Sequence, residues 1–123
     1  MKTMTSFTFI LLLAIGAMAH GASKREPPPI LIQATEAVAK AEAAGAQDYA
    51  PMELGFAHDR VALAQTAFNK RDNKATERLS QEALADAELA QAKVRAAKAR
   101  AAADALAAEN QKLQRDLLGG GKP

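Results

Sequence analysis

Residues 74–118 read KATERLSQEALADAELAQAKVRAAKARAAADALAAENQKLQRDLL and contain neither glycine nor proline. Alanine, which dominates the stretch, is the strongest helix former and carries no reactive group. We therefore expect one unbroken helix from Lys74 to Leu118. At 1.5 Å per residue, about 45 residues form a rod on the order of 65 Å long. Such a rod is typical of a protein that works by contact with other molecules.

Two shorter helices are expected before the rod. The first runs from Ile30 to Ala44 and ends at Gly45, a residue suited to the left-handed position after a helix. The second runs from Pro51 to Lys70, with proline at the first helical position, where no backbone donor is needed. Residues 46–50 form the connector between the two helices.

Apolar residues recur at helical spacing in both short helices. The first carries one stripe, Ile30, Ala34, Ala37, Val38 and Ala41, whereas the second carries two, Leu54, Ala57, Val61, Ala64 and Phe68 beside Phe56, Leu63 and Ala67. Two stripes suit the central member of a bundle. We expect an all-α fold, with two short helices packed antiparallel on the first half of a long C-terminal helix. Its far half then projects or finds a partner.

The first residues resemble an export signal. Lys2 precedes the apolar segment Phe7–Met18, and Ala17-Met18-Ala19 matches a cleavage site. Cleavage would start the mature chain at His20 and release it to the periplasm, whereas an uncleaved segment would anchor it to the inner membrane. The domain boundaries expected are a signal peptide over residues 1–19, a proline-rich spacer over 20–29, a helical domain over 30–118 and a flexible tail over 119–123.

The far part of the long helix carries a heptad pattern. Its members are Leu89, Ala92, Ala96, Ala99, Ala103, Leu106, Asn110, Leu113 and Leu117. Since alanine is so frequent, the match from Ala92 to Ala103 has little weight. Leu106, Asn110, Leu113 and Leu117 support a coiled-coil contact, for a protein partner or self-association, in which the single asparagine fixes register.

A basic run, Lys93, Arg95, Lys98 and Arg100, follows an acidic cluster, Glu82, Asp86 and Glu88. The run is a candidate site for an anionic envelope polymer or lipid head group. The alternative is a solvated surface whose charges balance. A formal net charge of +2 and the absence of interleaved aromatic residues do not favour nucleic acid.

No catalytic or metal-binding motif emerges. The chain has no cysteine and two histidines, and neither histidine has another at metal-ligand spacing. His58 is therefore expected to be a surface residue. We expect no catalytic residues, no metal, no cofactor and no enzymatic activity.

Two segments carry a family resemblance. Residues 45–54, GAQDYAPMEL, and residues 75–87, ATERLSQEALADA, make the chain similar to domain of unknown function 4398, an alanine-rich helical family of bacterial envelope and lipoprotein-like proteins. The resemblance spans about Ile30 to Leu118 and implies no catalytic residues. Where many members carry a lipid-modified cysteine, this chain has Ala22, so lipid attachment is not expected.

Together these features predict an exported, non-enzymatic helical protein with a structural or interaction role in the bacterial cell envelope. The alternative is a module that binds an anionic envelope component, such as peptidoglycan or lipid head groups, through the basic face. Membrane contact is expected only if the signal stays uncleaved.

Overall fold

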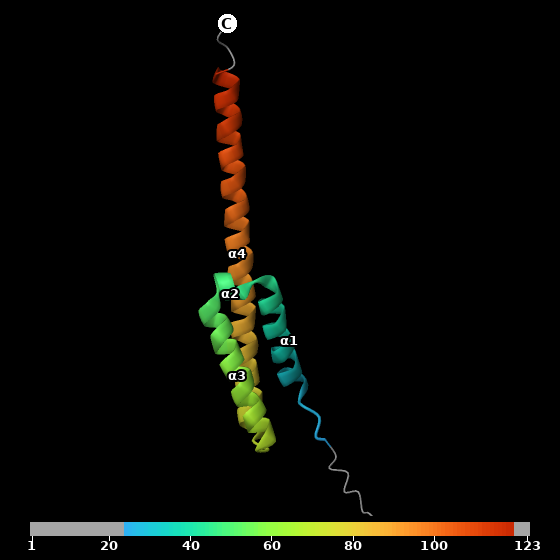
Figure 1. Cartoon of the computed structure of the whole chain (residues 1–123). Helices are drawn as coiled ribbons and strands as arrows, with labels where there is room; N and C mark the ends of the chain where they lie inside the picture. The colour runs from blue at the N-terminus through green and yellow to red at the C-terminus, as the bar shows by residue number, and fades with distance from the viewer. Residues whose placement is uncertain (1–23, 120–123) are drawn as a thin grey trace, which may run out of the picture.

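A computed structural model describes residues 24–119, and within this range every regular element is a helix. In chain order these are α1 (Pro29–Ala44), α2 (Ala46–Tyr49), α3 (Pro51–Asn69) and α4 (Asn73–Gly119). α1 and α3 lie along one half of α4, and the other half of α4 projects beyond them (Figure 1). The predicted all-α class and the packing on the first half of a long C-terminal helix are confirmed. The predicted export signal and most of the tail lie outside the described residues.

α4 is a single helix of 47 residues, about 70 Å long at 1.5 Å per residue. Its start is capped by Asp72, whose Oδ1 accepts a hydrogen bond from the backbone N–H of Ala75 at 2.9 Å. This bond satisfies one of the free donors at the helix N-terminus. Arg71 precedes the cap with φ 63°, which reverses the chain between α3 and α4. The predicted unbroken helix is confirmed.

The connector between α1 and α3 contains a short helix. Gly45 takes the expected left-handed conformation, with φ 94°, and ends α1. The residues after it form the short helix α2, to which no helix was assigned from the sequence, and a hydrogen bond from the N–H of Ala50 to the carbonyl oxygen of Ala46 at 2.8 Å closes it. Ala46 and Ala50 are both buried, so this turn adds two methyl groups to the core. Tyr49 remains 47% exposed at the surface.

The core is thin and rich in alanine. α1 and α3 both pack mainly on α4, which makes α4 the central helix. The expectation that the second helix is central is wrong, because Phe56 and Leu63 of its second stripe stay 51% and 54% exposed. Small side chains let the helix backbones approach closely, which compensates for the little apolar area that each one buries.

α4 faces its neighbours through an inner seam, defined here as Thr76, Ser80, Ala83, Ala87, Ala90 and Val94, all of them buried. The members alternate by four and three residues, the spacing of a coiled coil. After Ala97, which is partly covered, every residue from Lys98 to Gly119 is exposed. The bundle therefore ends near Lys98.

Polar contacts join the helices along the edges of this core. Arg60 of α3 forms ion pairs with Glu82, at 3.2 Å, and with Asp86 of α4. His58 Nε2 of α3 lies 2.7 Å from Glu42 Oε1 of α1. The acidic cluster of α4 thus supplies two carboxylates that fix α3. His58 is 49% exposed, in agreement with a surface position.

Candidate interaction surface

Every residue of the projecting half of α4, residues 98–119, is exposed, and we refer to this half as the arm. It is about 33 Å long. Its leucines are open to solvent, since Leu106, Leu113, Leu117 and Leu118 are 62%, 52%, 82% and 86% exposed. This row of exposed leucines makes the arm a candidate contact surface.

The four residues predicted to bind a partner lie on one face of the arm. Leu106, Asn110, Leu113 and Leu117 follow the spacing of four and three residues, so their side chains line up along the helix. The same face continues through Ala103 and Ala99 of the arm and then over the bundle through Ala96, Ala92 and Leu89, all of them exposed. We refer to these nine residues as the outer stripe.

The outer stripe and the inner seam lie on opposite sides of α4. Leu89 follows Ala87 by two positions, and Ala96 follows Val94 by two positions. Two residues correspond to a rotation of about 200° around the helix axis. α4 therefore has two faces of coiled-coil spacing, and the described chain covers only the inner one.

An aromatic side chain of α3 borders the outer stripe, which the sequence reasoning did not foresee. The ion pairs Lys93–Glu53 and Arg60–Asp86 fix α3 beside α4 at two levels. Phe56 lies between these levels on α3, three residues after Glu53, and is 51% exposed. Leu89, 48% exposed, lies between the same levels on α4. The only sequence signal of Phe56 was its membership in the second apolar stripe of α3.

The predicted anion-binding residues do not share one face or one role. Lys93 pairs with Glu53 of α3, and Lys98 donates a hydrogen bond to the carbonyl oxygen of Ala44 at 2.8 Å. Both lysines therefore hold the bundle together. Arg95 and Arg100 are exposed, and no ion pair joins either of them to another described residue. The four residues remain a predicted anion site, of which two guanidinium groups are open to solvent.

The Lys93–Glu53 pair also lowers the pKa of the Glu53 carboxyl. The hydrogen bond from Lys93 holds the pKa of the Glu53 carboxyl below its ordinary value. The backbone N–H of Glu53 lowers the pKa further, because both donors favour the ionised carboxylate. This pair therefore strengthens the contact between α3 and α4 only while the carboxyl stays ionised.

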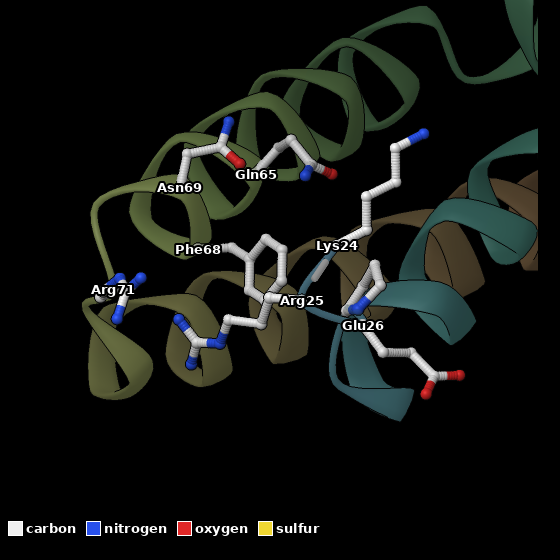
Figure 2. A pocket seen from close by; sticks show the side chains of 8 residues that line it. Lys24, Arg25, Glu26, Gln65, Phe68, Asn69 and Arg71 are labelled. Atoms are coloured by element: carbon white, nitrogen blue, oxygen red, sulfur yellow. The ribbon is translucent and has the colours of Figure 1, made fainter. Parts of the chain in front are cut away.

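The described segment before α1 contacts the opposite end of the bundle through Arg25. The Arg25 guanidinium lies 4.8 Å from the centre of the Phe68 ring and donates a hydrogen bond to the side chain of Asn73. It closes one side of an open cleft of about 730 Å³ that Gln65, Phe68 and Arg71 also line (Figure 2). The described part of the predicted spacer thus lies against the α3–α4 turn through Arg25.

Two further findings concern metal binding and membrane-spanning helices. Among residues 24–119, no three His, Cys, Asp or Glu side chains gather where they would hold a metal ion. Within the same range, none of the helices has both the length and the apolar character of a membrane span.

The fold and the exposed stripe define a small all-α protein in which a three-helix unit supports a projecting helical arm. A family model for a "Domain of unknown function (DUF4398)" matches residues 29–106, so the chain belongs to this family. The resemblance predicted from the sequence is thereby confirmed. The matched range covers the bundle and reaches the first part of the arm, up to Leu106. No curated protein and no solved structure matches the chain.

Proposed function

We propose that this chain is an exported, non-enzymatic interaction protein of the bacterial cell envelope. The three-helix unit fixes the direction of the arm, and the outer stripe binds a protein partner. Export is inferred from Lys2, the apolar segment Phe7–Met18 and the cleavage site Ala17-Met18-Ala19. The envelope role is inferred from the sequence resemblance described above.

The observation that carries the proposal is the exposure of the arm leucines. A leucine side chain that moves from water into a contact contributes about 1.5–3 kcal/mol. Leu106, Leu113 and Leu117 line one face with Asn110 among them, whereas the opposite face of the arm carries Ala101, Asp104, Ala108, Gln111 and Arg115. Apart from Leu118, the large apolar side chains of the arm therefore lie on one side.

The test is site-specific crosslinking in living cells. A photoreactive residue replaces Leu113 on the outer stripe or, as a matched control, Ala108 on the opposite face. We expect crosslinked adducts from position 113 but few from position 108, and we expect them in the periplasmic fraction. A chain that remains in the cytoplasm, or equal adducts from both positions, would overturn the proposal.

A second candidate function is the binding of an anionic envelope component. The observation in its favour is that Arg95 and Arg100 are exposed and join no described carboxylate. It predicts salt-sensitive binding to peptidoglycan sacculi or to vesicles that contain anionic lipid. Binding at low salt that is lost in the Arg95→Glu/Arg100→Glu variant would support it. The absence of binding at low salt would exclude it.

A further inference from the structure

We propose that the partner of the outer stripe is a second copy of this chain, bound antiparallel so that each arm lies along the other. This inference rests on the proposed function, because it names the occupant of the same face. Three features of the described residues carry it: the sizes of the side chains along the stripe, the charges beside it, and the place where each arm would end.

Side-chain size along the stripe favours the antiparallel direction. The stripe is alanine from Ala92 to Ala103 and, apart from Asn110, leucine from Leu106 to Leu117. A parallel pair would set alanine on alanine at one end and leucine on leucine at the other, and the two helices would need different separations. An antiparallel pair gives every layer the same width. Its layers are Leu106 with Ala103, Asn110 with Ala99, Leu113 with Ala96, and Leu117 with Ala92.

The charges beside the stripe select the same arrangement. In this register Arg95 of one copy lies between Glu109 and Asp116 of the other, and the two-fold symmetry repeats the contact. Arg95, Glu109 and Asp116 are all exposed and join no ion pair within residues 24–119. In a parallel pair Arg95 would instead face Arg100 of the second copy.

Each of the two neighbouring antiparallel registers sets two identical charged residues against each other. If one copy is shifted by seven residues toward the bundle of the other, Arg100 of one copy faces Arg100 of the other. A shift of seven residues the other way sets Glu109 against Glu109. Like charges that face each other at these flanking positions oppose association. The proposed register avoids both and overlaps the stripes from Ala92 to Leu117.

The end of each arm also reaches an apolar area. Leu117 of one copy arrives at Ala92 of the other, one turn from Leu89 and at the level of Phe56. These two side chains are 48% and 51% exposed in the single chain. The two bundles lie at opposite ends of the paired arms, so α1 and α3 of one copy do not meet those of the other.

The first test is the association state of the chain from His20 onward, the mature form that the export prediction implies. Sedimentation equilibrium over a concentration series should show a monomer–dimer equilibrium. Leu113→Glu should weaken dimerisation about a hundredfold, since it sets a charge against Ala96 in both symmetric layers. Ala108→Glu, on the other face, should leave dimerisation unchanged. Circular dichroism checks that both variants remain helical.

Charge variants test the register. Arg95→Glu should weaken the dimer about tenfold at low salt. The triple variant Arg95→Glu/Glu109→Arg/Asp116→Arg should restore it. Arg100→Glu makes the same change in net charge, yet it should leave the equilibrium unchanged. A tighter dimer from Arg100→Glu would show the parallel arrangement and overturn the proposal.

Disulfide exchange tests the direction independently, because the chain has no native cysteine. The proposed layers bring Ala96 and Leu113 of different copies within the Cα separation of about 4.4–6.8 Å that a disulfide spans. A mixture of Ala96→Cys and Leu113→Cys chains in a thiol redox buffer should favour the mixed disulfide over random pairing. A parallel pair would favour the two homodimers.

The outcomes separate this inference from the proposed function. A monomer at all concentrations, with adducts from position 113 that contain a different protein, would overturn the dimer and leave the interaction role intact. Adducts with the mass of two chains would support both. A monomer without such adducts would overturn both.

Discussion

The ammonium group of Lys98 donates a hydrogen bond to the carbonyl oxygen of Ala44, across a distance of 2.8 Å. Ala44 is the last residue of α1, and Lys98 is the first residue of α4 beyond the covered half. The bond therefore marks the upper end of the bundle and satisfies a carbonyl group that α1 leaves free.

Loss of this bond should destabilise the fold slightly. A cation at the C-terminus of a helix contributes about 0.3–1 kcal/mol. We expect Lys98→Ala to lower the free energy of unfolding by this amount in urea titrations. Lys112→Ala, on the arm, is the matched control and should have no effect. An equal loss from both variants would contradict the role assigned to Lys98.

Arg60 should contribute more than any other surface arginine of the bundle. It pairs with Glu82 and Asp86, and its guanidinium lies 5.7 Å from the centre of the Phe56 ring. We expect Arg60→Ala to cost about 1–2 kcal/mol in urea unfolding, from two ion pairs and one cation–π contact.

Arg78 provides the control for Arg60, because it pairs with Glu82 only along α4 itself and is 62% exposed. Arg78→Ala should cost about 0.3–0.5 kcal/mol. A loss from Arg60→Ala no larger than this would show that the pairs between α3 and α4 do not fix α3.

A larger side chain in the alanine-rich core should destabilise the protein. Ala87 is fully buried in the inner seam, where the backbones are close. We expect Ala87→Leu to destabilise the protein by about 1–3 kcal/mol, measured as a lower midpoint in thermal unfolding. Ala105→Leu, at an exposed position of the arm outside the outer stripe, should change stability by less than about 0.5 kcal/mol.

Acid should weaken the contact between α3 and α4 through Glu53. The folded chain holds the pKa of this carboxyl below its ordinary value. The associated stability is therefore complete above the unfolded pKa and is lost as the pH falls through the folded pKa. Thermal unfolding measured across the acidic range should show this loss in the native chain and a smaller one in Glu53→Gln. Identical pH profiles would contradict the assignment.

Much of the fold was predictable because single residues determine the helix ends. Gly45 needs no side-chain clearance at positive φ, and Pro51 suits a first helical position. The length of α4 followed from the absence of glycine and proline over residues 74–118. The short helix α2 was missed because its stability comes from burial of Ala46 and Ala50, which no local pattern reveals.

The faces of the helices were harder to predict. Alanine is so common in α4 that the inner seam and the outer stripe both fit a heptad, and the sequence does not state which one packs inside. Arg60 bridges residues more than twenty positions away, so its partners depend on the helix pairing. The arm leucines were identified because they stand out among alanines.

The continuity of α4 across Lys98 has a mechanical consequence. No glycine or proline interrupts α4 near Lys98, where α1 and α3 cease to cover it, so there is no hinge between the bundle and the arm. A force applied at Leu117 is transmitted along one rigid lever to Thr76, and two points fastened near its ends are held about 60 Å apart. A glycine pair inserted after Lys98 would introduce a hinge there while the core contacts of α1 and α3 remain.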